Sequence, residues 1–405
     1  YLNVEAPNAS MASLEEIRKK LLEFKNETEK FTIAYSEIYS QKGYYIASMA
    51  DEIYIHPEGI LEFVGLAYQG MFFKDALKKL EIEPQIIRHG KFKAAVEPYI
   101  LEKMSSENRA QISKFINSIW TDMLSDISAS RKIDNGNLFQ IAQKLKVQKS
   151  SDAVTTGLID ATLYKDQVLD TLRKKLNKKL DADIEVTKLK AYNNAKLVGN
   201  KKKYSKDKIA IVYAYGEIIG GEGDNESIGS ERISRAIRNA LTDENVKAIV
   251  LRVNSPGGSA LASETILREM ILAKAEKPVV VSMGDVAASG GYYISCHADT
   301  IVANPTTITG SIGVFGLLMN TQKLMKNKLG ITIDTVKTNQ FADMGSMYRS
   351  LTEKERNIIH KSVKDVYKTF ISHVAKGRNM SKKEVDAIGQ GRVWTGTDAL
   401  DLGLV

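Results

Sequence analysis

The sequence predicts an α/β protein built as a tandem duplication of one domain, and three observations carry this prediction. Residues 41–46, Gln-Lys-Gly-Tyr-Tyr-Ile, recur 248 positions later as Ser-Gly-Gly-Tyr-Tyr-Ile at residues 289–294. Around both copies, short runs rich in Val and Ile alternate with segments of helical periodicity, which is typical of a largely parallel sheet covered by helices. A chain of 405 residues also exceeds one core of ordinary size and suits two domains.

The second copy gives the clearer pattern of elements. We expect buried strands over residues 209–213, 248–253 and 279–282, because each is a short apolar run. Helical periodicity between them predicts helices over residues 230–241 and 260–275. Strand and helix therefore alternate along this copy.

The first copy repeats this order. A predicted helix at residues 13–24 and a predicted strand at residues 31–35 correspond to residues 262–273 and 279–283 of the second copy. Each copy then ends in a long helical region, at residues 106–131 and 352–378, followed by the related segments 152–158 and 398–404. The duplication thus covers nearly the whole chain.

These patterns divide the chain into three predicted parts. Residues 1–160 form the first repeat, residues 161–207 a charged linker, and residues 208–405 the second repeat. The lysine runs at 174–175, 178–179 and 201–203 are interpreted as a solvated linker, with a patch that faces anionic lipid as the alternative. Tyr1 aligns opposite Val250, so we expect the start of the first repeat, and any signal or anchor, to lie upstream of this sequence.

Composition excludes several classes of protein. With 43% apolar and 26% charged residues the chain is globular rather than disordered. A single cysteine, Cys296, excludes an internal disulfide and a cysteine zinc cluster, and the five histidines have no ligand spacing, so no metal or cofactor is expected. The net charge is +8, but no basic groove with interleaved aromatic residues appears, and nucleic acid is not an expected partner.

Ser289 is the first candidate for chemistry. It lies in the segment Gly-Asp-Val-Ala-Ala-Ser-Gly-Gly at residues 284–291, after a predicted strand and before a predicted helix. At a helix N-terminus its hydroxyl and the next amide face the positive end of the helix dipole, which suits a nucleophile. A capping serine followed by glycines for close packing explains this segment equally well.

A second loop strengthens the catalytic interpretation. Residues 254–259, Asn-Ser-Pro-Gly-Gly-Ser, place Gly257 and Gly258 directly after a buried strand, and their amides together with that of Gly290 would form an oxyanion hole. A tight Pro-Gly turn also explains the loop. It does not explain why the first copy lacks both features. That copy has Ala-Pro-Asn-Ala-Ser at residues 6–10 in place of the glycine pair, and Gln41 in place of Ser289.

A nucleophilic serine needs a base, and Lys93 is the best candidate. His297 lies eight residues beyond Ser289 and is interpreted as a packed or surface histidine. Alignment of Phe92 with Phe341 places Ala342 opposite Lys93, so the first copy keeps a lysine that the second lacks. These complementary losses distinguish Lys93 from the other lysines of the chain.

As a base, Lys93 requires a depressed pKa and a fixed orientation. Its pKa must fall from about 10.4 towards roughly 7 to 8, and burial at the contact between the two copies is expected to cause this fall. Ser311, in Thr-Gly-Ser-Ile-Gly at residues 309–313, is a candidate for orienting the amine. A plain Gly-Ser turn remains the alternative for that segment.

These segments, with Lys-Ala-Ala-Val-Glu-Pro at residues 93–98, resemble the long, duplicated form of the signal peptide peptidase A (protease IV) family over almost the whole chain. The resemblance implies a Clp-protease/crotonase-like fold and a Ser/Lys dyad, with Ser289 as nucleophile, Lys93 as general base and Ser311 beside the lysine. It also implies a homo-oligomer, commonly a tetramer. This assembly would be anchored in the bacterial inner membrane with its catalytic part on the outer, periplasmic face, and it would degrade cleaved signal peptides.

The resemblance therefore favours a serine endopeptidase that hydrolyses apolar peptides. Two alternatives stay open at this point. A crotonase-like acyl-CoA enzyme would share the fold and the oxyanion loop, and an inactive membrane scaffold would share the fold alone.

Overall fold

The computed structural model describes residues 1–28, 30–187, 191–192 and 205–405, which form two compact units. Unit 1 comprises residues 1–65 and 120–207, and unit 2 comprises residues 66–119 and 208–405. The division falls inside one long helix, α5 (Ser106–Arg131). The lysine run at 201–203 lies outside the described residues.

The bounds of the compact units differ from those of the predicted segments. Residues 66–119 of the predicted first repeat belong to unit 2, where β3 (Glu83–His89) pairs antiparallel with β12 (Val314–Asn320). The first part of the predicted linker is folded within unit 1 rather than being a solvated connection. There β4 (Ala161–Thr162) extends a sheet and α8 (Lys165–Lys175) buries two apolar side chains, Val168 and Leu172.

Unit 2 is built on a six-stranded, mostly parallel sheet. The three strands predicted from apolar runs are present as β5 (Lys208–Tyr215), β8 (Val246–Ser255) and β9 (Val279–Ala288). They continue into β11 (Ile308–Gly310) and β13 (Val393–Thr395) in the order β13-β11-β9-β8-β5, while β10 (Thr300–Val302) also pairs with β9. Only the β11–β13 pair is antiparallel within this sheet of the described chain.

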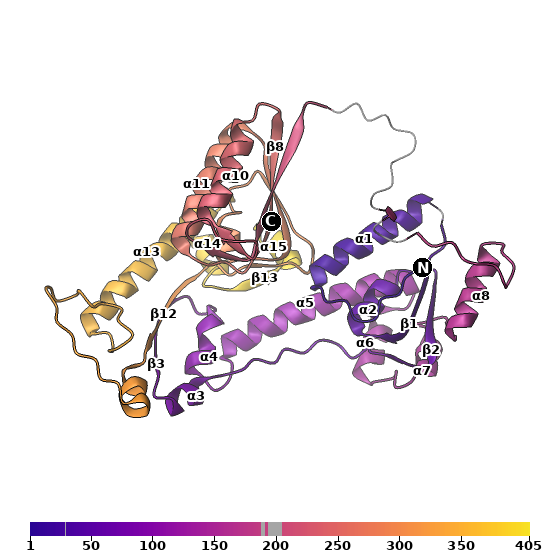
Figure 1. Cartoon of the computed structure of the whole chain (residues 1–405), viewed down its shortest axis with the longest axis horizontal. Helices are drawn as coiled ribbons and strands as arrows, with labels where there is room; N and C mark the ends of the chain where they lie inside the picture. Colours follow the sequence, from indigo (N-terminus) through magenta and orange to yellow (C-terminus); the bar gives the residue numbers. More distant parts are fainter. Residues whose placement is uncertain (29, 188–190, 193–204) are drawn as a thin grey trace. The chain divides into compact units, whose positions relative to one another are not determined.

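Helices α10 (Ser230–Thr242) and α11 (Ala260–Glu276) lie side by side in unit 2 (Figure 1). Helix α10 buries Ile233, Ile237 and Ala240, a spacing that places all three on one helical face. The remaining helices of the unit are α3 (Lys74–Lys79), η1 (Ala94–Val96), α4 (Glu97–Ile100), α12 (Gly290–Tyr293), η2 (Leu324–Lys328), α13 (Glu353–Gly377), α14 (Lys382–Ile388) and α15 (Gly396–Asp401). A short parallel pair, β6 (Glu217–Ile219) and β7 (Ser227–Gly229), lies outside the main sheet.

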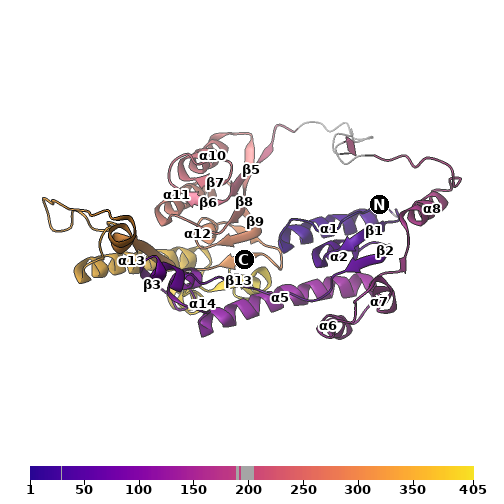
Figure 2. The same ribbon diagram turned by 60° about the horizontal axis from the view of Figure 1, so that its bottom comes forward.

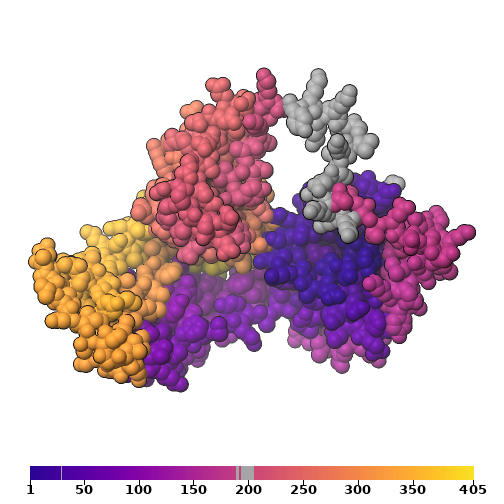
Figure 3. All heavy atoms as spheres, in the orientation of Figure 1, coloured from indigo at the N-terminus to yellow at the C-terminus, as the bar shows by residue number. Residues whose placement is uncertain are grey.

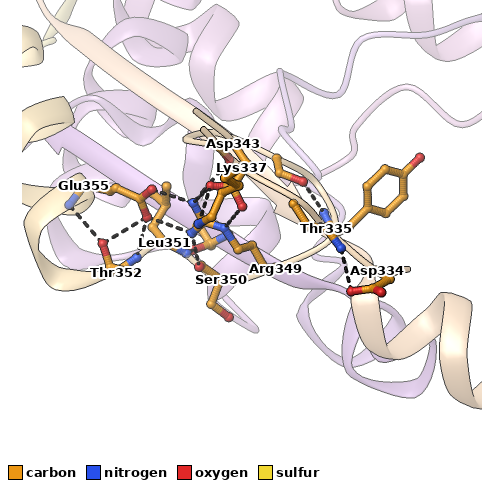
Figure 4. A network of polar contacts seen from close by, with 12 residues as sticks. Asp334, Thr335, Lys337, Asp343, Arg349, Ser350, Leu351, Thr352 and Glu355 are labelled. Carbon is orange, nitrogen blue, oxygen red and sulfur yellow. Dashed lines mark hydrogen bonds and ion pairs between the residues drawn. The ribbon is translucent and has the colours of Figure 1, made fainter. Parts of the chain in front are cut away.

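Residues 321–350, which we call the arm, follow β12 in unit 2. The orange spheres of this region lie against the violet ones of the α3–β3 region in Figure 3, in agreement with the β3–β12 pairing and an ion pair between Lys328 and Glu81. At the end of the arm, the Arg349 guanidinium bridges the carboxylates of Asp343 and Glu355 (Figure 4). The arm is thereby fastened to the first turn of α13.

Unit 1 contains a smaller parallel sheet with the strand order β1-β2-β4. Strands β1 (Ile33–Tyr39) and β2 (Glu52–Leu61) contact α2 (Gln41–Ala47), and α1 (Met11–Thr28) packs beside α2 (Figure 2). Helices α6 (Asn135–Gln143) and α7 (Ser150–Thr155) complete the unit together with the second part of α5. Its core is continuous from Leu14 on α1 to Met123 on α5.

The duplication is visible in matched hydrogen bonds within the two units. The Tyr44 hydroxyl donates to the Leu158 carbonyl oxygen at 2.8 Å, and the Tyr292 hydroxyl donates to the Leu404 carbonyl oxygen at the same distance. Two related aspartates likewise bind a backbone amide near the start of the preceding strand: Asp51 accepts from Thr32 N–H, one residue before β1, and Asp299 accepts from Val279 N–H, the first of β9. Matched long-range bonds of this kind agree with the predicted tandem arrangement.

Within the part of the chain that the structure describes, none of the helices combines enough length and apolar character to cross a membrane.

Candidate active site

Three neighbouring strands of the unit 2 sheet end at the same place. Strand β8 ends at Ser255 before the loop that contains Gly257 and Gly258, and β9 and β11 end before Ser289 and Ser311. Because these strands are parallel, their carboxyl ends lie along one edge of the sheet, where loops converge on a common site. The predicted nucleophile, oxyanion loop and lysine-orienting serine therefore meet.

Ser289 occupies a sharp turn between β9 and α12. Its backbone has φ 54° and ψ −117°, in a region that residues other than glycine rarely adopt. Its N–H donates to the Gly310 carbonyl oxygen at 2.9 Å, and its own carbonyl oxygen accepts from Tyr293 N–H at 2.9 Å. Backbone bonds thus hold the turn from both sides. The Ser289 side chain makes no capping hydrogen bond to α12.

Lys93 reaches this serine from a different part of the sequence. It lies in the loop between β3 and η1, and its side chain is only 5% exposed. Its Nζ lies 3.1 Å from Ser289 Oγ, although the two residues are 196 positions apart. The structure therefore brings together the serine and the lysine that the sequence singled out in different repeats.

Ser311 provides the other two partners of the amine. Lys93 Nζ donates to Ser311 Oγ at 2.9 Å and to the Ser311 carbonyl oxygen at 3.1 Å. Ser311 also has a positive φ, 49°, which turns its backbone carbonyl towards the lysine. A neutral amine can donate its two N–H groups to these acceptors, so that its lone pair faces Ser289 Oγ.

Burial lowers the pKa of Lys93 from its ordinary 10.5 to about 8, because the ammonium form loses its hydration. Among the described residues, no carboxylate forms an ion pair with this amine. The buried carboxylate of Glu97, four residues away, is instead bonded to Ser105 and Asn108 and lies 3.7 Å from Arg88. A substantial fraction of Lys93 is therefore neutral slightly above neutral pH.

Two backbone amides near Ser289 have no hydrogen-bond acceptor among the described residues, those of Gly258 and Gly290. They are close together, since a methyl group built on Gly290 would lie 3.1 Å from the Gly258 nitrogen. Unpaired donors beside a serine hydroxyl can bind a developing oxyanion. The N–H of Gly257, by contrast, donates to Ser255 Oγ at 3.1 Å.

Gly257 has a different part in this geometry. Its φ is 105°, and a methyl group there would lie 2.6 Å from the Gly290 nitrogen and 2.8 Å from Ser289 Cβ. Glycine at this position therefore lets the loop approach the serine turn closely.

The corresponding position of the first copy, Gln41, makes structural contacts instead. Its side-chain oxygen accepts from the N–H groups of Val64 and Gly65, and its amide donates to the Gly65 carbonyl oxygen at 3.0 Å. The side chain that replaces the serine thus makes three hydrogen bonds within unit 1.

The site opens into a cavity of about 530 Å³ within unit 2. Its lining includes eight apolar and aromatic side chains, which are Ala95, Pro256, Ala260, Tyr293, Val314, Phe315, Val366 and Phe370, and it also includes Glu217, Ser259 and Ser263. Such a cavity suits an apolar ligand with a few polar groups near the serine.

His297 lies away from this arrangement of groups. Its Nε2 is 3.4 Å from His373 Nδ1, and burial lowers its pKa to about 4. In the described residues, no group of three or more His, Cys, Asp or Glu side chains is placed to hold a metal ion.

Sequence reasoning missed the residues that pack against the backbone and Cβ of Lys93. Gly391 contacts Lys93, and Gln390 bonds to the neighbouring Phe92. Their segment, Gly-Gln-Gly-Arg at 389–392, has two glycines, one on either side of a polar residue, which signals a tight turn but not its neighbour in space.

The fold and the site define a class: an α/β protein in which a serine at a strand-to-helix turn faces a buried lysine and unpaired backbone amides. The chain belongs to peptidase family S49, whose model matches residues 24–180 and 271–405. The match to two separate stretches, with the mixed α/β architecture, confirms the predicted class and tandem arrangement.

Known proteins support this assignment. Protease 4 of Haemophilus influenzae is 37% identical over 406 residues, which is 98% of this chain and 65% of that protein. Protease 4 of Salmonella typhi is 38% identical over 412 residues, covering 98% of this chain and 64% of that protein. The chloroplastic serine protease SPPA of Arabidopsis thaliana is 33% identical over 413 residues, covering 100% of this chain and 60% of that protein.

The chain thus spans slightly less than two thirds of the length of these relatives. A solved ClpP1 structure from Listeria monocytogenes gives a TM-score of 0.32 at 17% identity, over 48% of this chain and 88% of that chain. This similarity is too low to carry an argument about the present fold.

Proposed function

We propose that this chain is a serine endopeptidase in which Ser289 is the nucleophile and Lys93 the general base. One observation carries the proposal: an amine almost excluded from water lies 3.1 Å from a serine hydroxyl, and its other acceptors both belong to Ser311. A nucleophile within hydrogen-bond reach of a base that a third group orients is the general arrangement for acyl transfer. Membership of peptidase family S49 supports the same reaction.

In the first step, neutral Lys93 accepts the proton of the Ser289 hydroxyl while Oγ attacks the carbonyl carbon of a peptide bond. The carbonyl oxygen becomes an oxyanion between the N–H groups of Gly258 and Gly290, which have no other acceptor among the described residues. Both donors are in place before the reaction, so they stabilise the developing charge without reorganisation.

In the second step, the tetrahedral intermediate collapses and the bond from carbon to nitrogen breaks. The Lys93 ammonium returns its proton to the leaving amine, and an acyl ester remains on Ser289. A water molecule then attacks this ester, with Lys93 accepting its proton. Transfer of that proton to Ser289 Oγ releases the acid product and restores the starting state.

We propose apolar peptides, and cleaved signal peptides in particular, as the substrates. The cavity beside Ser289 is lined by eight apolar and aromatic side chains, and Glu217 is the one carboxylate among its described lining residues. An extended apolar peptide would bury its side chains there. The resemblance of the sequence motifs to the signal peptide peptidase A family supports this choice.

Assembly and location are further proposals. We propose that the whole protein is a homo-oligomer, such as a tetramer, held at the outer face of a bacterial inner membrane by a segment outside this sequence. The mass of the purified protein in detergent and its partition between membrane and soluble fractions test these two points.

The central experiment compares hydrolysis of a fluorogenic apolar peptide by the wild type, Ser289→Ala, Lys93→Ala and Lys91→Ala between about pH 6 and pH 10. Lys91 is an exposed lysine two positions from the proposed base and serves as the matched control. We expect both site variants to lose activity by about 10³-fold or more. The wild-type kcat/KM should rise with pH through one ionisation near 8, because only the neutral amine accepts a proton.

Near-normal turnover by folded Lys93→Ala would contradict the proposed base. Hydrolysis of acyl-CoA thioesters without hydrolysis of peptides would instead favour the crotonase-like alternative. Failure of Ser289 to react with a fluorophosphonate in the folded wild type would favour the inactive scaffold.

A further inference from the structure

A tight turn between α14 and β13 packs directly against Lys93. Gln390 and Gly391 both have positive φ, 56° and 81°. A methyl group built on Gly391 would lie 2.6 Å from Lys93 Cβ and 2.8 Å from Lys93 Cα. The turn therefore covers the Cα and Cβ of Lys93, and only glycine fits at the point of contact.

The same turn is bonded to both sides of the lysine site. Gln390 accepts a hydrogen bond through its carbonyl oxygen from the N–H of Phe92, which directly precedes Lys93, at 2.9 Å. Gly391 N–H donates to the Ile312 carbonyl oxygen at 2.7 Å, and the Arg392 carbonyl oxygen accepts from Ser311 N–H at 2.7 Å. Three consecutive residues thus fix the backbone of the lysine and that of the serine that orients it.

A buried tyrosine and an aspartate hold the turn from behind. The Tyr367 hydroxyl donates to Asp386 Oδ1 at 2.6 Å and accepts from Gln390 N–H at 3.2 Å. The Gln390 side-chain amide donates to the same Asp386 oxygen at 2.6 Å. Tyr367 is 2% exposed and packs against His89 at the end of β3, with ring centroids 4.2 Å apart.

We propose that residues 390–392, fixed by Tyr367 and Asp386, form a positioning element that sets the distance from the Lys93 amine to Ser289 and keeps water from the lysine stem. None of these residues reaches the reacting atoms, so they act through Lys93 and Ser311. This inference rests on the proposed function. A looser turn should both misplace the amine and let water solvate its ammonium form.

The test compares Gly391→Ala with Gly403→Ala in the full chain. Gly403 has a similar positive φ, 71°, but a methyl group there would have no neighbour within 4 Å, so it matches the backbone strain without the contact. For Gly391→Ala we expect kcat to fall about 100-fold, the loss that a displacement near 1 Å can cause, with KM changed less than about twofold. The acid limb of the pH profile is the rise of kcat/KM with pH, and its apparent pKa should increase from about 8 towards 10.5. Gly403→Ala should change neither quantity.

Tyr367→Phe provides a second variant that keeps the aromatic ring and removes only the hydroxyl between Asp386 and Gln390. We expect the same upward shift of the acid limb with a smaller loss of kcat, about tenfold, because one link of the element is lost rather than its contact with Lys93. Thermal unfolding monitored by circular dichroism verifies that each variant is folded.

Two results would overturn the inference. One is a folded Gly391→Ala whose kcat and acid limb match the wild type or match Gly403→Ala. The other, decisive if Gly391→Ala does not fold, is a Tyr367→Phe variant with an unchanged acid limb and kcat. The proposed function fails separately, through retained activity of Lys93→Ala, and that result does not depend on any variant of the turn.

Discussion

Ser289 and Ser311 directly follow two residues, Ala288 and Gly310, that pair across adjacent parallel strands, and both serines have positive φ. The N–H of Ser289 donates to the Gly310 carbonyl oxygen, so the two turns are bonded to each other. The Lys93 amine lies within hydrogen-bond distance of both hydroxyls, 3.1 Å from Ser289 Oγ and 2.9 Å from Ser311 Oγ. Their spacing is fixed by sheet geometry, which does not depend on loop conformation.

Lys93→Met is expected to be more stable than the wild type at pH 7. Because the pKa of Lys93 is about 8 when folded, the lysine opposes folding by about 3 kcal/mol at pH values below 8. Lost bonds to Ser311 offset part of this, so we expect a net gain of about 1 to 2 kcal/mol. Urea unfolding at pH 7 measures it.

The difference in the free energy of unfolding between Lys93→Met and the wild type should change with pH in a definite direction. Between about pH 8 and pH 10.5 the unfolded wild type binds more protons than the folded form, so its stability rises with pH relative to Lys93→Met. The advantage of the variant should therefore shrink or reverse near pH 10. A difference that stays constant across this range would contradict the depressed lysine pKa.

Gly290→Ala should lose activity without unfolding. Its methyl group would lie 3.1 Å from the Gly258 nitrogen, where it blocks the second amide, and 2.7 Å from Ser263 Oγ, which must shift to make room. We expect kcat to fall about 10²- to 10³-fold, as for loss of one oxyanion donor. Gly220→Ala, where a methyl group would have no neighbour within 4 Å, is the control. Equal activity of the two variants would exclude this oxyanion site.

Arg349→Lys should loosen the arm although it keeps the charge. Arg349 bonds Asp343 through Nε at 2.6 Å and Glu355 through Nη1 at 2.8 Å, and a lysine amine cannot bridge both carboxylates in this way. We expect a loss of about 1 to 2 kcal/mol in the free energy of unfolding at pH 7. Hydrogen exchange of residues 321–350 should rise at the same time.

Acid weakens this network in the wild type. Hydrogen bonding to Arg349 lowers the pKa of Glu355 to about 2, so its contribution to stability is present above the ordinary carboxyl pKa and is lost as the pH falls towards 2. The difference in the free energy of unfolding between Arg349→Lys and the wild type should therefore become smaller as the pH falls. A difference that is independent of pH would show that the ion pairs are not its source.

His297→Ala should retain activity within about threefold of the wild type, with an unchanged acid limb. The ring contacts His373, and its pKa of about 4 keeps it neutral throughout the assay range. Steady-state kinetics between pH 6 and pH 10 test this. A loss comparable to that of Lys93→Ala would make the histidine, rather than the lysine, the candidate base.

Residue patterns alone predicted much of the fold and the groups at the site. Periodicity gave the main strands and helices, and comparison of the repeats singled out Ser289 and Lys93, because complementary losses are visible in one sequence. Periodicity does not specify which distant segments pack together. The predicted three-part division therefore differs from the compact units, in which β3 pairs with β12 and residues 66–119 belong with the second repeat.

Backbone geometry was also beyond sequence reasoning. The sequence predicted Gly290 with Gly257 or Gly258 as oxyanion donors and could not choose between the last two. In the structure Gly257 N–H is already bonded to Ser255, and its lack of a side chain matters instead for close approach. The contact of Gly391 with Lys93 joins residues about 300 positions apart and leaves no local pattern.

The Gln41 side chain has a consequence for stoichiometry. In the first repeat its oxygen and its amide bond to the backbone of residues 64–65, at the position that corresponds to Ser289, the proposed nucleophile of the second repeat. Replacing it with serine would remove those bonds and create a hydroxyl without the lysine arrangement of unit 2. Active-site titration should therefore yield one equivalent of acyl-enzyme per chain, and a burst of that size would count folded molecules directly.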